Sequence, residues 1–151
     1  MTLIPSGLIS EYSMRKPNEL SKSTPEDYKM GKLLGKGAYA EVRECVYLPN
    51  SKCYAMKVYE KIKLIDMQKK RNTIREIHIL EEIDHPNIIH LYNVLETSRN
   101  VMLLIELVKG KSLKLLIKDN PCGITEKDYI KLFKQILSAV EYLHQKHIAH
   151  R

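Results

Sequence analysis

The chain has 151 residues, of which 44% are apolar and 28% are charged. This composition is ordinary for a soluble globular protein and excludes the disordered and fibrous classes. The net charge of +7 would suit a nucleic acid or an acidic membrane. However, the basic residues are spread along the chain with one local excess over residues 57–75. We therefore expect no specific nucleic-acid partner, whereas a nucleic-acid-binding protein would show tight, salt-sensitive binding.

The cysteines and the hydropathy pattern indicate the compartment. The three cysteines, Cys45, Cys53 and Cys122, have no CxxC spacing, so they predict neither a disulfide framework nor a zinc site. The longest apolar run, residues 101–108, is interrupted by Glu106 and is too short to span a bilayer. The first ten residues lack the basic start of a signal peptide. We expect reduced thiols, no membrane span and a cytoplasmic or nuclear location.

The first predicted elements are a flexible leader and three strands. Residues 1–24 contain two prolines and a Ser/Lys-rich stretch without a sustained hydrophobic period, which is typical of a flexible leader. Three antiparallel strands are then predicted over residues 28–36, 39–48 and 52–60. Glycines lie in the first turn of this sheet, and Pro49-Asn50-Ser51 forms the second.

A helix and two more strands complete the predicted sheet domain. The helix covers residues 65–83, because apolar residues recur every three positions between charged ones. Pro86 prevents the helix from continuing. Two short strands follow over residues 91–96 and 101–107, giving five strands in all.

The last part of the chain is predicted to be helical. A short helix covers residues 112–118, a turn follows at 121–123, and a long helix starts at a capping box formed by Thr125 and Asp128. The long helix has an apolar stripe made of Ile130, Phe133, Leu137, Val140 and Leu143. Because this stripe needs a partner, we expect aggregation, self-association or dependence on another protein through this helix.

A glycine-rich turn followed by a lysine indicates a phosphate site. Gly35 and Gly37 lie between the first two strands, and Lys57 lies on the third strand. Glycine lets the backbone approach phosphate oxygens closely, and the lysine can direct a positive charge at them. Taken alone, the glycines would suit an ordinary hairpin and the lysine an exposed strand position. The order of the motifs along the chain favours the phosphate site over these ordinary alternatives. The motifs are Ala55-Met56-Lys57, Glu76 in the predicted helix, His85-Pro86-Asn87, Ile105-Glu106-Leu107-Val108 and His150-Arg151.

These motifs, in this order, resemble the protein kinase domain over roughly residues 28–151. The run 81–89 and Tyr142-Leu143-His144 look most like the calcium/calmodulin-dependent and AMP-activated group of serine/threonine kinases. The resemblance implies an α+β fold in which residues 25–108 form a kinase-like small lobe, a five-stranded antiparallel sheet with one long helix. Residues 109–151 would be the first helices of an incomplete large lobe.

The resemblance also implies an ATP site. Lys57 would contact the α- and β-phosphates and pair with Glu76, which is preferred over Glu81 and Glu82 because it shares a helix face with Leu80. The backbone would cover the phosphates at Gly35, Lys36, Gly37, Ala38, Tyr39 and Ala40. The adenine would contact Leu34, Val42, Ala55, Ile105, Glu106 and Val108, with Ile105 gating the back pocket. Without the motifs, Leu34, Val42 and Ala55 would read as ordinary sheet core.

One residue departs from the family's glycine motif. Ala40 stands where the third glycine usually lies. If that position required a positive φ, alanine would cost about 1 kcal/mol and loosen the loop's hold on the nucleotide.

The end of the chain sets the expectation for catalysis. His150 and Arg151 resemble the start of the catalytic loop, where the family uses the histidine for packing and the arginine for an activation-loop phosphate. The catalytic Asp, the Asn and Asp that hold Mg²⁺, and the activation loop are not in this sequence. No residues resemble a metal site. We expect the 151-residue chain alone to be inactive, whereas the intact domain would phosphorylate protein serine or threonine with ATP and Mg²⁺. The alternative is a truncated, pseudokinase-like module that binds nucleotide or acts as a scaffold.

Overall fold

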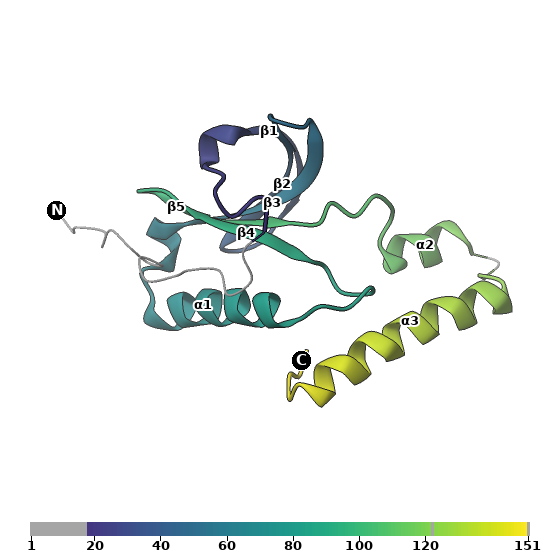
Figure 1. Ribbon diagram of the computed structural model, residues 1–151. Helices are drawn as coiled ribbons and strands as arrows, with labels where there is room; N and C mark the ends of the chain where they lie inside the picture. The colour runs from purple at the N-terminus through teal and green to yellow at the C-terminus, as the bar shows by residue number, and fades with distance from the viewer. Residues whose placement is uncertain (1–17, 122, 151) are drawn as a thin grey trace. The chain divides into compact units, whose positions relative to one another are not determined.

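The computed structural model describes residues 18–121 and 123–150, and it divides into two compact units (Figure 1). The first unit contains the residues up to Glu82 together with His90–Leu107. The second contains Ile83–Ile89 and the residues from Val108 onward. The first unit is built from η1 (Pro25–Asp27), β1 (Tyr28–Lys36), β2 (Ala40–Tyr47), β3 (Lys52–Glu60), η2 (Lys61–Leu64), α1 (Met67–Glu82), β4 (Leu91–Glu96) and β5 (Asn100–Ile105), where η1 and η2 are 3-10 turns.

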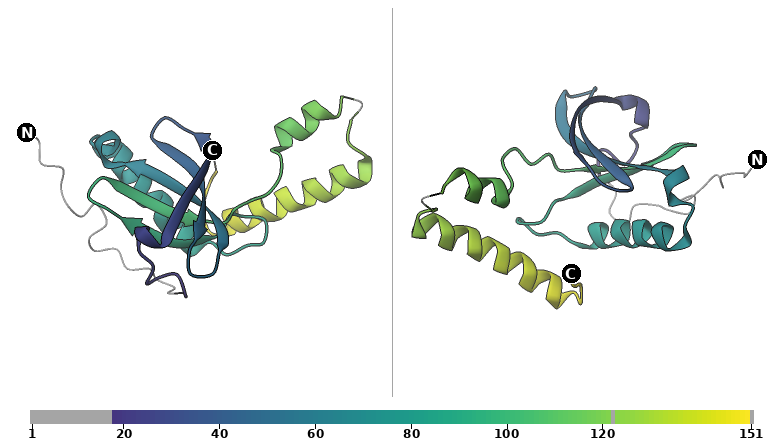
Figure 2. Two further views of the ribbon diagram at one scale, coloured as in Figure 1. Left: turned by 90° about the horizontal axis from the view of Figure 1, so that it is seen from above. Right: turned by 180° about the vertical axis from the view of Figure 1, so that it is seen from behind.

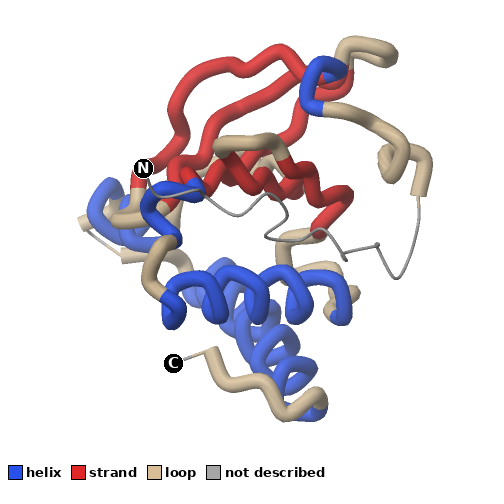
Figure 3. The backbone as a smooth tube through the Cα atoms, turned by 90° about the vertical axis from the view of Figure 1, so that its left-hand side faces the viewer, coloured by secondary structure: helices blue, strands red, loops and turns tan. Residues whose placement is uncertain are grey.

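The five strands form one curved layer, as Figure 3 shows. Their order is β1-β2-β3-β5-β4, and every neighbouring pair is antiparallel. The prediction of a five-stranded antiparallel sheet accompanied by one long helix is therefore confirmed. Val42 on β2 is the register partner of Lys57 on β3, and Lys57 is in turn the partner of Leu103 on β5.

Both faces of the sheet are covered by apolar side chains. Side chains alternate between faces along a strand, so Ala55 and Tyr59 of β3 lie on one face and Tyr54 and Met56 on the other. The first face packs against α1 through Ile77, which is 1% exposed. The interior strand β5 contributes to both faces, and its residues from Val101 to Ile105 are all buried. Lys57 shares its face with Ala55 and Tyr59, so the sheet directs it toward α1.

The segment just before η1 differs from the predicted flexible leader. Leu20 is only 6% exposed and belongs to the apolar cluster on the sheet face opposite α1. Asn93 donates a side-chain hydrogen bond to the Leu20 carbonyl at 2.6 Å, and Asn18 donates one to the Tyr92 carbonyl at 2.6 Å. A single leucine among polar residues gives no periodic signal, which is why the sequence pattern missed this packing. Residues 1–17 of the predicted leader lie outside the described residues.

The main helix begins later than predicted. The chain first forms η2, and α1 starts at Met67 rather than at Ile65. The Asp66 carboxylate accepts a hydrogen bond from the Gln68 amide at 2.8 Å, and the Asp66 carbonyl accepts one from the Lys70 amide at 3.0 Å. The Asp66 carboxylate thus satisfies one of the amides that the first helical turn leaves without partners, and its carbonyl accepts the first bond of the helix. The helix that starts here is the one that carries Glu76.

The second unit contains two helices, α2 (Leu113–Asp119) and α3 (Glu126–Gln145) (Figure 2). As the sequence predicted, Thr125 caps α3 by accepting a hydrogen bond from the Asp128 amide at 3.3 Å. The segment at residues 83–89 is held to α3, because the Tyr142 hydroxyl accepts from the Asp84 amide at 2.9 Å and His85 lies 3.0 Å from the Ser138 hydroxyl. The predicted apolar stripe of α3 is between 36% and 50% exposed at Ile130, Phe133, Leu137 and Val140. Association through this stripe stays a prediction.

None of the helices within residues 18–121 and 123–150 is long and apolar enough to cross a membrane.

The two described cysteines are free thiols with opposite environments. Cys45 is completely buried, and burial raises its pKa to about 11, whereas Cys53 is exposed. Because the thiolate is the reactive form, we expect iodoacetamide at pH 8 to alkylate Cys53 at least about tenfold faster than Cys45 in the folded protein. Mass spectrometry of the peptides after timed quenching measures both rates. Equal rates without denaturant would show that β2 does not bury Cys45.

Candidate functional site

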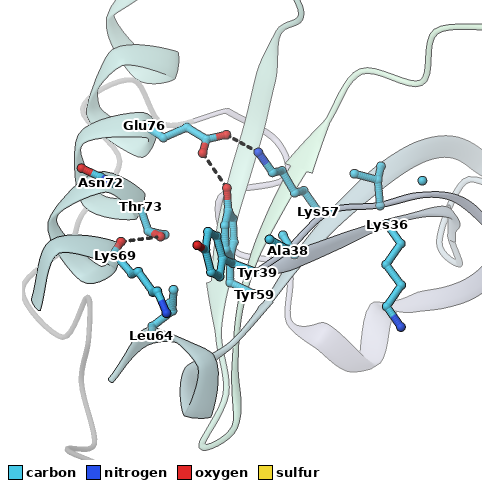
Figure 4. Close-up of a pocket in the computed structure, with 14 residues that line it drawn as sticks. Lys36, Ala38, Tyr39, Lys57, Tyr59, Leu64, Lys69, Asn72, Thr73 and Glu76 are labelled. Atoms are coloured by element: carbon cyan, nitrogen blue, oxygen red, sulfur yellow. Dashed lines mark hydrogen bonds and ion pairs between the residues drawn. The ribbon is translucent and has the colours of Figure 1, made fainter. Parts of the chain in front are cut away.

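A cavity of about 460 Å³ lies in the first unit between the β1–β2 turn, β3 and α1 (Figure 4). This volume is within the usual range for small-molecule sites. All six residues predicted to cover phosphates line it, together with residues that the sequence did not single out. The lining is Gly35, Lys36, Gly37, Ala38, Tyr39, Ala40, Val42, Lys57, Tyr59, Leu64, Lys69, Asn72, Thr73 and Glu76.

Lys57 and Glu76 meet in this cavity. The Lys57 ammonium lies 2.5 Å from Oε1 of Glu76, joining β3 to α1. The two side chains are 28% and 36% exposed, so the pair is open to solvent on one side. A solvent-accessible ion pair of this kind stabilises a fold by only about 0–1 kcal/mol, so the stability of the fold depends little on it.

The β1–β2 turn supplies the roof of the cavity. The Gly37 amide donates a hydrogen bond to the Ala40 carbonyl at 2.8 Å, which closes the turn. A Cβ at Gly35 would meet no atom within 4 Å, so internal packing does not require glycine there. Ala40 is not among the residues with positive φ, and it pairs with Tyr59 in the sheet. The substitution of alanine for the family's third glycine therefore causes no backbone strain in this structure.

Two side chains of the turn take different directions. The Lys36 side chain points away from the Lys57–Glu76 pair (Figure 4). Tyr39 is 47% exposed, and the Lys69 ammonium of α1 lies 4.7 Å from the centre of its ring. A cation at this distance is attracted to the ring face. The turn and the first part of α1 are thus in contact across the cavity.

The residues predicted to bind adenine do not line this cavity, apart from Val42. Leu34 is 44% exposed on β1, while Ala55 and Ile105 are buried register partners on neighbouring strands. The Glu106 amide donates a hydrogen bond to the His90 carbonyl at 2.9 Å, which fixes the backbone just after β5. Val108 and His150 are exposed residues of the second unit. Arg151 lies outside the described residues.

Sequence reasoning missed five residues of the cavity wall, namely Tyr59, Leu64, Lys69, Asn72 and Thr73. Two simple periodicities could have found four of them. Tyr59 is two positions after Lys57, so it shares the same strand face. Lys69, Asn72 and Thr73 lie seven, four and three positions before Glu76, so they share its helix face. Leu64 required knowledge of the turn η2, which no pattern indicated.

The charges in the cavity favour an anionic ligand. Lys57 and Lys69 contribute two positive charges, and Glu76 contributes one negative charge. The Glu76 carboxylate accepts a hydrogen bond from Lys57 and so orients the Lys57 ammonium toward the cavity. It leaves the positive charge of Lys69 without neutralisation. Among the residues that the structure describes, no group of three or more His, Cys, Asp or Glu side chains could hold a metal ion. These described residues therefore do not fit Mg²⁺ as a resident ion.

A comparison with known families identifies the domain. The model of the protein kinase domain matches residues 28–151, which is more than half of the chain. The chain therefore belongs to the protein kinase domain family, and the resemblance drawn from its motifs is confirmed. The sheet, α1 and the helices that follow agree with the family's small lobe and the start of its large lobe.

Several curated relatives are serine/threonine kinases. The chain is 40% identical over 133 residues to calcium/calmodulin-dependent protein kinase type I of Schizosaccharomyces pombe, covering 84% of the chain and 38% of the relative. It is 37% identical to the serine/threonine-protein kinase DCLK2 of Mus musculus, covering 89% and 18%. It is 34% identical to the SNF1-related protein kinase catalytic subunit alpha KIN12 of Arabidopsis thaliana, covering 92% and 28%. The chain thus spans less than two fifths of the length of each of these relatives.

Proposed function

We propose that this chain is the ATP-binding portion of a protein serine/threonine kinase. The observation that carries the proposal is the Lys57–Glu76 pair, 2.5 Å apart beneath a glycine-containing turn. Membership of the kinase family and the serine/threonine kinases among its relatives support the reaction and the substrate class. Residues 25–108 would form the small lobe and residues 109–151 the start of the large lobe.

The phosphates of ATP would bind at the cavity. The backbone from Gly35 to Ala40 would cover them, because a turn without bulky side chains lets amides approach phosphate oxygens. Lys57 would contact the α- and β-phosphates, with Glu76 holding its ammonium in place. Phosphoryl transfer depends mainly on such positioning and on charge neutralisation, and these residues would supply both for the nucleotide.

The adenine would bind beside β3 and the end of β5. Leu34, Val42 and Ala55 would pack against the ring, and Ile105 would limit the depth of the pocket. The Glu106 amide already donates to His90, so its carbonyl is the group available to accept from the adenine amino group.

The other requirements of the reaction would lie in a longer protein. When bound, Mg²⁺ supplies charge neutralisation at the phosphates, and its ligands would come from outside this chain. The protein substrate would also bind outside it. We propose a location in the cytoplasm or nucleus, where thiols such as those of Cys45 and Cys53 stay reduced.

Nucleotide binding by the purified 151-residue chain tests the proposal. We expect a fluorescent ATP analogue to bind saturably, with ATP competing more strongly than adenosine because only ATP engages Lys57 and the glycine turn. Far-UV circular dichroism before and after the titration controls for folding. If the folded chain gives no saturable signal at millimolar ATP, the proposed function is wrong.

A further inference from the structure

Tyr59 reaches the Lys57–Glu76 pair from inside the sheet. It lies two residues after Lys57 on β3 and is 5% exposed. Its ring belongs to the apolar cluster that includes Leu64, Ile77 and Val101. The hydroxyl of this otherwise apolar side chain ends at the edge of the cavity, where Figure 4 shows it pointing at Glu76.

The Glu76 carboxylate is shared between two donors on one strand. Lys57 donates to Oε1 and Tyr59 donates to Oε2, each at 2.5 Å. The Lys57 ammonium also lies 5.2 Å from the centre of the Tyr59 ring, within the range of a cation–π attraction. Lysine, carboxylate and phenol are thus mutual neighbours, and both oxygens of Glu76 are held from β3.

The phenol remains a donor throughout the working pH range. Burial, followed by the hydrogen bond to Glu76 and the negative charge of that carboxylate, raises the pKa of Tyr59 above its ordinary value. The hydroxyl therefore keeps its proton at neutral pH and well above it. A hydroxyl that donates to a carboxylate forms a shorter and stronger bond than one between neutral groups.

We propose that Tyr59 is a positioning residue that fixes the Glu76 carboxylate and, through it, the Lys57 ammonium for contact with a nucleotide phosphate. This inference rests on the proposed function. When Lys57 turns part of its hydrogen bonding toward a phosphate, its hold on Glu76 weakens. Tyr59 then keeps Oε2, and with it α1, attached to β3. Without the hydroxyl, the carboxylate is free to rotate and the lysine loses its fixed direction.

A simpler interpretation is that Tyr59 is a core residue whose hydroxyl takes the nearest acceptor. The two interpretations differ in what they predict for phosphate. A merely structural tyrosine would change the binding of ATP and adenosine together, because both need a folded sheet. A positioning residue would change ATP binding alone, because adenosine lacks the phosphates that Lys57 contacts.

The test is the variant Tyr59→Phe, which removes the hydroxyl and keeps the ring. We expect the affinity for ATP to fall about threefold to tenfold, as for the loss of one hydrogen bond. Adenosine affinity should stay unchanged. In a Lys57→Met background the same substitution should have no effect on ATP, because Tyr59 acts through the lysine. The matched control is Tyr54→Phe, which removes a hydroxyl from a tyrosine that is 3% exposed on the opposite face of β3.

The outcomes separate this inference from the proposed function. If the wild-type chain is folded and binds no ATP, both fail. If wild type binds ATP and Tyr59→Phe binds it equally well, only the positioning role fails. A parallel loss of ATP and adenosine binding, or an undiminished effect in the Lys57→Met background, also overturns the positioning role. Hydrogen exchange over α1 gives a second readout that needs no nucleotide: faster exchange at residues 69–82 in Tyr59→Phe is expected, and unchanged exchange contradicts the anchoring of α1.

Discussion

Replacing Lys57 with methionine is expected to weaken ATP binding about tenfold to a hundredfold, because a hydrogen bond to a charged group contributes about 1.5–3 kcal/mol. Methionine has a similar length and keeps the apolar contacts of the side chain while removing the charge. Adenosine binding should change little, since Lys57 would contact only phosphates. Competition titrations of ATP and adenosine against a fluorescent analogue measure the two effects separately.

The control for this prediction is Lys29→Met. Lys29 is an exposed lysine of the same sheet, on β1, so its replacement alters the net charge equally without touching the cavity. We expect ATP affinity to remain within about twofold of wild type, because an exposed charge at a distance is screened by salt. Equal losses in the two variants would mean that net charge, and not the position of Lys57, governs binding. Folding is expected to survive, because the Lys57–Glu76 pair is partly exposed and contributes about 0–1 kcal/mol.

The sequence was sufficient for the architecture because hydrophobic alternation and turn residues agree along the first unit. The strand β3 was predicted with its observed bounds, and β1 was as well. The pairing of Lys57 with Glu76 is implied by the resemblance to the kinase domain, and the helical period favours Glu76 over Glu81 and Glu82 because Glu76 shares a helix face with Leu80. The structure brings the Lys57 ammonium and the Glu76 carboxylate to 2.5 Å. The ATP-binding role of that pair is still a proposal.

The features that the sequence did not reveal depend on single residues rather than on periods. Asp66 caps the start of α1 through its side-chain hydrogen bond, but the apolar Ile65 before it extends the helical period and hides this boundary. Leu20 covers part of the sheet from a segment whose composition indicates a loop. Tyr59 donates to Glu76 only because β3 and α1 come together in three dimensions. Tertiary contacts decide the roles of Leu20 and Tyr59, and a local pattern does not contain them.

A buried ion pair beside the site was also absent from the predictions. Lys61 in η2 lies 2.5 Å from Glu96 at the end of β4, and the two side chains are 1% and 17% exposed. Lysine is rarely buried so completely unless it is paired. Because η2 leads directly into α1, this pair fixes the turn from which the helix carrying Glu76 departs.

The variant Glu96→Leu is expected to lower the free energy of unfolding by about 3–5 kcal/mol, because it leaves the buried ammonium of Lys61 without this carboxylate. The double variant Lys61→Met/Glu96→Leu should be more stable than Glu96→Leu alone, since no buried charge remains. Urea unfolding followed by far-UV circular dichroism gives the energies for wild type, the two single variants and the double variant.

The neighbouring pair of Lys63 and Glu60 provides the control for burial. Its nitrogen and oxygen are 2.6 Å apart, nearly the same distance, but its side chains are 42% and 47% exposed. Glu60→Leu should therefore cost at most about 1 kcal/mol, because water replaces the lost partner of an exposed charge. Two results would contradict the argument: equal losses in Glu60→Leu and Glu96→Leu, or strictly additive effects of Lys61→Met and Glu96→Leu. Either would mean that solvent reaches Lys61, and that burial does not determine how strongly the sheet holds the start of α1.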